Sequence, residues 1–130
     1  MVSAEIHFNS GERAKMNLKA EKHEDGNYLV VQGGRVYRFD LPAADQLYSF
    51  SFSDREKAIE VRAFRPWDTE IVLKCRHAHF GGPFIITSED GYECRLLRED
   101  FRELAHDLWM LFPASERKFN PSLIEGVSFR

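Results

Sequence analysis

The sequence has few of the features that mark a secreted or membrane protein. It contains two cysteines, Cys75 and Cys94, which are too few for a disulfide framework in a chain of 130 residues able to build its own core. No apolar run approaches the roughly 18 residues of a membrane span. The first residues lack the basic and apolar segments of a signal peptide. We therefore expect a cytoplasmic protein with reduced thiols and no membrane association.

Strong charge and catalytic motifs are also missing. The formal net charge of −3 is too small to indicate a general nucleic-acid binder or a DNA mimic. The Gly33-Gly34 and Gly81-Gly82 pairs are not followed by predicted helices, so they do not form phosphate-binding loops. No carboxylate pair stands out, and no nucleophile has a base and an oxyanion site that the sequence can identify. We expect a protein that is not an enzyme and that needs no cofactor.

Phenylalanine, in contrast, is abundant, with 11 residues in the chain. Aromatic side chains favour strands and fill wide cores. The composition is 43% hydrophobic and 30% charged, which is typical of a globular protein. A chain of this length is expected to form a single domain over residues 1–130.

Short segments of alternating polarity predict β-strands. Between residues 13 and 21, for example, Ala14, Met16, Leu18 and Ala20 fall on one face. Turn-forming residues separate such segments along most of the chain. The predicted strands cover residues 3–8, 13–21, 28–32, 35–41, 47–53, 59–63, 71–76, 84–87 and 92–97. In segment 47–53, Tyr48, Phe50 and Phe52 alternate with serines.

One amphipathic helix is predicted over residues 100–112. Its apolar stripe consists of Phe101, Leu104, Ala105, Leu108, Leu111 and Phe112. Asp100 is the expected N-cap, with Glu103 completing a capping box, and Pro113 ends the helix. Residues 114–130 are expected to pack on the domain as an extended tail.

These elements predict an α+β fold made of an antiparallel β-meander and one C-terminal amphipathic helix. About eight or nine strands joined by short turns cannot form a parallel sheet, which needs long crossovers. A sheet of this size curls into a barrel or roll, or splits into two layers. The helix is expected to plug an open end or to cover one face.

Two interpretations of Cys75, His77, His79 and Cys94 stay open. On a strand, the first three side chains share one face, and two thiolates with two imidazoles are a known zinc set. The spacing is atypical for zinc, because structural sites mostly use ligands separated by two or more residues. We favour buried core cysteines and no bound metal. A catalytic hypothesis for the same residues would make Cys75 the nucleophile and His77 its base, but no other sequence feature supports it.

A basic strand face gives the main candidate binding surface. If Val61 and Leu73 face the core, Arg62, Lys74 and Arg76 face outward, with Arg65 and Trp67 at the edge. Basic groups mixed with aromatic rings suit acidic proteins or phosphate backbones. The alternative is an ordinary solvated face whose cations pair with Glu60, Glu70 and Glu93 across the strands.

We therefore expect a non-catalytic binding module that docks on another macromolecule. The favoured partner is a protein, with the chain acting as an inhibitor, an immunity protein or an adaptor. The first alternative is a β-barrel domain that binds a small ligand or a metal, with the barrel mouth near His77 and His79. The second alternative is nucleic-acid binding through the arginine-rich strand face.

Overall fold

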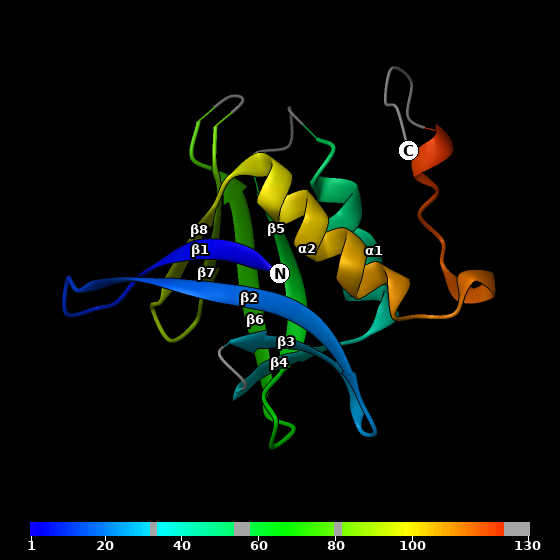
Figure 1. Cartoon of the computed structure of the whole chain (residues 1–130), viewed down its shortest axis with the longest axis horizontal. Helices are drawn as coiled ribbons and strands as arrows, with labels where there is room; N and C mark the ends of the chain where they lie inside the picture. The colour runs from blue at the N-terminus through cyan, green and yellow to red at the C-terminus, as the bar shows by residue number, and fades with distance from the viewer. Residues whose placement is uncertain (32–33, 54–57, 80–81, 124–130) are drawn as a thin grey trace.

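The computed structural model of the protein describes residues 1–31, 34–53, 58–79 and 82–123. Within these ranges the chain forms eight β-strands and two α-helices, followed by two short 3₁₀ helices. The strands are β1 (Val2–His7), β2 (Arg13–His23), β3 (Gly26–Val31), β4 (Gly34–Phe39), β5 (Ala58–Phe64), β6 (Glu70–His77), β7 (Phe84–Ser88) and β8 (Glu93–Leu96). Helix α1 (Leu41–Phe50) lies between β4 and β5, and α2 (Arg98–Met110) follows β8. Figure 1 shows this arrangement.

The strands form a closed antiparallel barrel. Each strand pairs with the next one along the chain, and β1 pairs with β8 to close the wall. The predicted antiparallel meander is therefore confirmed, and it takes the form of a barrel. The wall is least continuous between β4 and β5, where Arg38 opposite Phe64 is the one register pair among the described residues. Helix α1 occupies the connection between these two strands.

Side chains alternate between the interior and the outer surface of the barrel, as the period of two predicts. On β5 and β6, Val61, Leu73 and Cys75 are buried. Glu60 and Lys74 lie opposite each other in the register and are exposed. Barrels of eight strands enclose an interior that is just wide enough to be filled by side chains or to hold one small ligand.

Helix α2 is the predicted amphipathic helix, over residues 98–110 instead of 100–112. Its buried residues are Phe101, Leu104, Ala105, Leu108 and Trp109. The predicted cap is wrong, because the N-cap residue is Leu97 and no side chain caps the helix. Asp100 lies within the first turn, where a negative charge interacts favourably with the helix dipole. Neither described helix has the length and apolar character needed to cross a membrane.

Residues 47–50 of the predicted strand 47–53 belong to helix α1, so that prediction is wrong. Asp40 is the N-cap and accepts a hydrogen bond of 3.0 Å from the Ala43 backbone N–H. Pro42 lies in the first turn, where its missing N–H removes no helical hydrogen bond. The buried residues of the helix are Ala43, Ala44, Leu47, Tyr48 and Phe50. Packing of this stripe outweighs the short alternation of aromatic residues and serines.

The barrel has two different ends. The β1–β2, β5–β6 and β7–β8 turns lie at one end, which we call the turn end. Both helices lie at the other end, which we call the helix end, and Figure 1 shows them away from the β5–β6 turn. At the helix end the Phe84 ring stacks on Phe101 with centroids 4.4 Å apart, and Phe50 meets Phe84 edge-on at 5.4 Å. Aromatic side chains thus pack against one another at this end of the barrel.

The segment after α2 returns to the helix pair. The Phe119 ring meets Tyr48 edge-on at 5.4 Å. The backbone N–H groups of Lys118 and Phe119 each donate to the Asp45 carboxylate at 3.3 Å. Of the expected tail over residues 114–130, residues 124–130 lie outside the described residues.

Candidate ligand-binding cavity and outer wall

The barrel interior contains a cavity of about 230 Å³ at the turn end. Seven of the eight strands, all except β5, or the turns next to them, contribute to its lining, which is almost entirely apolar. Its apolar walls include Leu18, Leu29, Val31, Leu73 and Ile86. Phe8 and Tyr92 line it from the β1–β2 and β7–β8 turns, and their rings meet edge-on at 5.6 Å. The cavity therefore lies inside the barrel and is bordered by turn residues.

A second apolar cavity of about 60 Å³ lies nearer the helix end. Leu104 and Leu108 of α2 and Leu47 of α1 belong to its lining. Five residues line both cavities: Leu29, Tyr37, Leu73, Ile86 and Cys94. The interior is therefore incompletely filled along most of the distance from the turns to the helices.

Ser88 and Tyr37 bring hydroxyl groups to the wall of the larger cavity. Ser88 lies opposite the inward-facing Leu73 and is 8% exposed. Its Oγ atom is buried and makes no hydrogen bond of good geometry, although it lies close enough to the Tyr37 hydroxyl to interact with it. Burial raises the pKa of the Tyr37 phenol, while the neighbouring Ser88 hydroxyl and the charge of Arg65 act in the opposite direction. The two hydroxyls are the main polar features of an otherwise apolar lining.

The two cysteine thiols also face the interior. Cys75 lies opposite Ile86, and Ile86 lies opposite Cys94, so the thiols are two strands apart, roughly 10 Å across the sheet. Both cysteines are free, and this separation exceeds the reach of a disulfide. Burial raises the pKa of both thiols from 9.0 to about 12, so both are neutral at ordinary pH.

His77 and His79 lie at the helix end, away from the larger cavity. The His77 ring packs 4.5 Å from the Phe84 ring and 4.9 Å from the Phe50 ring. His79 is exposed. Among the described residues, no three histidine, cysteine or acidic side chains converge in a group that could hold a metal ion. A more polar pocket of about 430 Å³ includes Ala78 and Pro83 in its lining, next to these two histidines. A mouth near His77 and His79 therefore stays a prediction.

The predicted binding residues of β5 and β6 share the outer wall of the barrel but are largely engaged with acidic neighbours. Arg62 forms an ion pair of 3.3 Å with Glu70, and Arg76 lies 3.7 Å from Glu93. Lys74 lies opposite Glu60 in the register. Three predicted cations thus share one face, where carboxylates alternate with them.

The other two predicted residues lie at the turn end. Arg65 forms an ion pair with Asp90, which connects the β5–β6 turn to the β7–β8 turn. The Arg65 guanidinium also lies 5.5 Å from the centroid of the Trp67 ring. Trp67 is 68% exposed, which is unusual for so large an aromatic side chain. These two residues therefore form the rim between the outer wall and the cavity.

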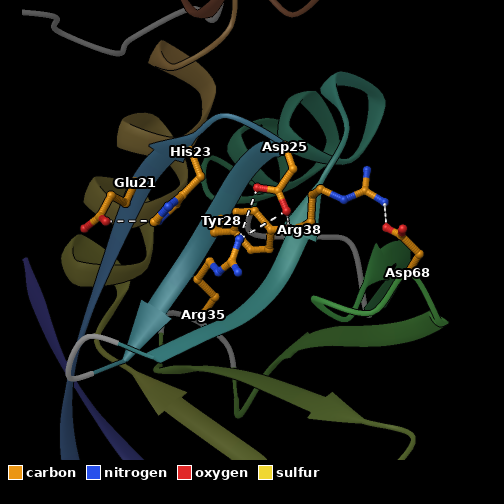
Figure 2. Close-up of polar contacts among 7 residues, drawn as sticks. All are labelled: Glu21, His23, Asp25, Tyr28, Arg35, Arg38 and Asp68. Carbon is orange, nitrogen blue, oxygen red and sulfur yellow. Dashed lines mark hydrogen bonds and ion pairs between the residues drawn. The ribbon is translucent and has the colours of Figure 1, made fainter.

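A separate polar network covers the outer wall at β2, β3 and β4 (Figure 2). Tyr28 faces outward and is fully buried, and its hydroxyl donates to the Asp25 carboxylate at 2.8 Å. Arg35 donates to the same carboxylate at 3.1 Å, with its guanidinium 5.0 Å from the Tyr28 ring centroid. The Tyr28 hydrogen bond, aided by Arg35, lowers the pKa of Asp25. Gly26 has a φ of +146°, and Arg38 occupies the space that a Cβ would need there. This network stabilises the β2–β3 turn.

No family model, curated protein or solved structure is similar enough to this chain to count as a match. The functional argument therefore depends on the cavity and on the outer wall themselves. Fold alone would in any case not assign an activity, because the same architecture hosts many functions.

Sequence reasoning misses Ser88 as a site residue, because Ser88-Glu89-Asp90-Gly91 has the composition of a turn. In the structure Ser88 is the last residue of β7, and Gly91 completes the turn by donating its N–H to the Ser88 carbonyl at 2.9 Å. Continuing the alternation of Phe84 and Ile86 by one step would place Ser88 on the inner face. No sequence signal reveals the cavity, because its volume depends on how eight strands curve together.

Proposed function

We propose that this protein binds a small, mostly apolar molecule inside its barrel. The observation that carries the proposal is the apolar cavity of about 230 Å³. An engineered apolar cavity of about 150 Å³ in another protein stays dry and binds benzene. A cavity of the present size accommodates a somewhat larger body, such as a fused pair of aromatic rings or a short alkyl chain.

Packing considerations support a ligand over an accidental void. Protein interiors are close-packed, and voids larger than a water molecule are few. Small residues such as Cys94 lie on the wall where a larger side chain would fill the space. Binding sites for small molecules are typically concave and apolar with a few polar groups, which is the character of this lining.

The chemistry of the lining favours binding without catalysis. The Cys94 thiol is held neutral because burial raises its pKa to about 12, and only a thiolate is an effective nucleophile. Among the described residues the lining includes no histidine or lysine that could act as a base. A carrier or a ligand-sensing module is the role that this lining supports best.

The test is a fluorescence titration with phenylnaphthylamine, an apolar dye that brightens in apolar sites. We expect saturable binding with a Kd on the order of 1–100 μM, the range for an apolar ligand of this size. Cys94→Phe fills the cavity and should weaken binding at least about tenfold, a loss of roughly 1.4 kcal/mol. Arg95→Phe is the matched control, because the next residue on β8 pairs with outward-facing neighbours on β1 and β7. It should keep the affinity within about twofold.

Two results of this experiment would refute the proposal. Absence of dye binding to the folded wild-type protein would refute the proposal, as would equal binding by a folded Cys94→Phe variant. A second readout needs no variant: naphthalene should slow the reaction of Cys94 with a small thiol reagent in the native protein. Unchanged labelling at saturating naphthalene would count against the cavity as the site.

Docking of a protein partner on the outer wall is the second candidate function. It is favoured by Trp67, which is exposed on the rim beneath the Arg65 guanidinium. Tryptophan and arginine are the residue types that most often carry binding energy at protein interfaces. Arg62, Lys74 and Arg76 would extend this surface, in an inhibitor or adaptor role. A pull-down with the wild-type chain and with Trp67→Ala, which should lose the partner, tests this candidate.

A further inference from the structure

The Ser88 hydroxyl is the feature of the cavity that packing does not explain. Its residue is 8% exposed, and its Oγ atom is buried without a hydrogen bond of good geometry. The Tyr37 hydroxyl is a polar neighbour that interacts with it. The neighbouring turn does not need the side chain, because the Ser88 N–H donates to the Tyr92 carbonyl at 3.0 Å and the Ser88 carbonyl accepts from Gly91. A buried hydroxyl without a partner is unfavourable, and alanine would avoid this penalty. A ligand group that hydrogen-bonds to Ser88 would satisfy it.

The surroundings of Ser88 indicate an uncharged partner. Arg65 and Asp90, whose charges act on the neighbouring Tyr37 phenol, form an ion pair with each other. Glu93 is the one charged residue of the lining among the described residues, and it pairs with Arg95 at 3.2 Å and with Arg76 at 3.7 Å. A charged ligand group would therefore enter the apolar interior without an available counter-charge, which is strongly unfavourable.

The position of Ser88 in the barrel determines how such a ligand would be oriented. Ser88 is the last residue of β7 and lies at the turn end, beside Tyr37. The lining towards the helix end is formed by apolar residues such as Leu104 and Leu108. A ligand with one polar group would place this group near the turns and its apolar body towards α2.

We propose that the barrel selects a neutral amphiphile, an apolar ring or chain carrying one hydroxyl or carbonyl that hydrogen-bonds to Ser88. This inference rests on the proposed function, because it names the class of ligand for the same cavity. It excludes fatty-acid-like anions as preferred ligands. It also assigns Ser88 as a residue that determines specificity.

The test compares three ligands of one ring size: naphthalene, β-naphthol and β-naphthoate, each competing with bound phenylnaphthylamine. Near neutral pH the first two are uncharged and the third is an anion. We expect β-naphthol to bind about five- to tenfold more tightly than naphthalene, the effect of one hydrogen bond. We expect β-naphthoate to bind at least about tenfold more weakly than β-naphthol, because no counter-charge is available.

Ser88→Ala separates the hydrogen bond from the shape of the cavity. It should abolish the advantage of β-naphthol over naphthalene and leave the affinity for naphthalene within about twofold. The variant removes one buried oxygen that makes no hydrogen bond of good geometry, so it should fold about as well as the wild type. Ser3→Ala is the matched control, since Ser3 is exposed on β1 and should affect none of the three affinities.

The outcomes separate this inference from the proposed function. If phenylnaphthylamine and naphthalene both fail to bind, cavity binding itself is wrong. If naphthalene binds and Cys94→Phe prevents it, cavity binding stands. In that case, equal affinities for β-naphthol and naphthalene in the wild type would overturn the assignment of Ser88. Tightest binding by β-naphthoate, or an advantage of β-naphthol that survives Ser88→Ala, would overturn it as well.

Discussion

The two ends of the barrel are built from similar apolar residues and differ in how these residues are packed. At the helix end, Phe84 is completely buried between Phe50 and Phe101, and α2 covers the opening with its apolar stripe. At the turn end, Phe8 and Tyr92 contact each other on the border of an unfilled cavity. The wall strands are shared, so the difference comes from what is placed over each opening.

If the cavity binds a ligand as proposed, this contrast separates the residues that determine stability from the residues that determine affinity. A helix supplies a continuous apolar face and leaves a cavity of only about 60 Å³ at its end of the barrel, whereas tight turns offer few side chains. The turn end is therefore where the barrel can leave space without losing its main core. If this division is correct, substitutions at the helix end should mainly reduce the free energy of unfolding. Substitutions at the turn end should mainly change ligand affinity.

The largest effect is expected for Leu108→Asp in α2. Leu108 is 2% exposed, so the change removes core contacts and buries a charge. The expected loss exceeds about 5 kcal/mol of the free energy of unfolding, enough to unfold a protein of ordinary stability. Met110→Asp is the matched control, because Met110 is 50% exposed on the same helix. Circular dichroism of both variants checks this, and a folded Leu108→Asp variant would show that the face of α2 is wrongly assigned.

A pair of phenylalanine truncations compares the two ends directly. Phe84→Ala should lower the free energy of unfolding by about 3–5 kcal/mol, because its ring is completely buried and stacked. Phe8→Ala should lower it by only about 1 kcal/mol, since its ring is half-buried and loses mainly the edge-on contact with Tyr92. Denaturant titrations measure both values. Equal losses would contradict the division between the two ends.

Alkaline titration tests whether the interior is dry at both ends. Burial raises the pKa of Cys75 and Cys94 from 9.0 to about 12 in the folded state. The unfolded chain ionises first, so the contribution of these thiols to stability is intact below about pH 9 and is lost as the pH rises towards about 12. At about pH 10, each thiol should have lowered the free energy of unfolding by about 1.4 kcal/mol relative to its value below about pH 9.

The thiolate absorbance of a Cys75→Ala variant gives the pKa of Cys94 by itself. We expect a folded-state pKa near the value of about 12 that burial produces. Titration close to 9.0 would mean that water reaches the cavity wall, which would weaken the case for an apolar ligand.

The smallest effect on stability is expected for reversing two charges on the outer wall. Arg62 and Arg76 form partly exposed ion pairs with Glu70 and Glu93, and such pairs contribute little. Arg62→Glu combined with Arg76→Glu should change the free energy of unfolding by less than about 1 kcal/mol. Phenylnaphthylamine binding should be unaffected. If the second candidate function is correct, this folded variant should lose its protein partner, and full retention of the partner would refute docking on this wall.

The strands and α2 could be predicted from the sequence because their patterns are local. Each wall strand has one face in the barrel and one in solvent, which imposes a period of two. Helix α1 was missed because Tyr48, Phe50 and Phe52 alternate with serines over a few residues. The Asp40 cap, Pro42 and the pair Ala43 and Ala44 are the stronger signal, since they begin a helix and continue its buried stripe.

The candidate site could be predicted only in part. The outward position of Arg62, Lys74 and Arg76 follows from alternation alone. Their pairing with acidic residues on neighbouring strands depends on the register, which local sequence does not give. The cavity is still less accessible to sequence reasoning. Ser88 and Cys94 border it from strands that are neighbours in space, and the empty volume between them arises only when the wall closes.

The pairing of β1 with β8 also means that the barrel closes only after nearly the whole chain has been synthesised. Glu5 lies opposite Arg95, so the closing strand leaves the ribosome long after the first one. Until then one edge of β1 has no partner, and the polar outward residues Ser3, Glu5 and His7 protect it from pairing with other chains. Cys94 arrives on that same last strand. The nascent chain therefore has no enclosed interior, and the proposed ligand could bind only after the whole barrel has closed.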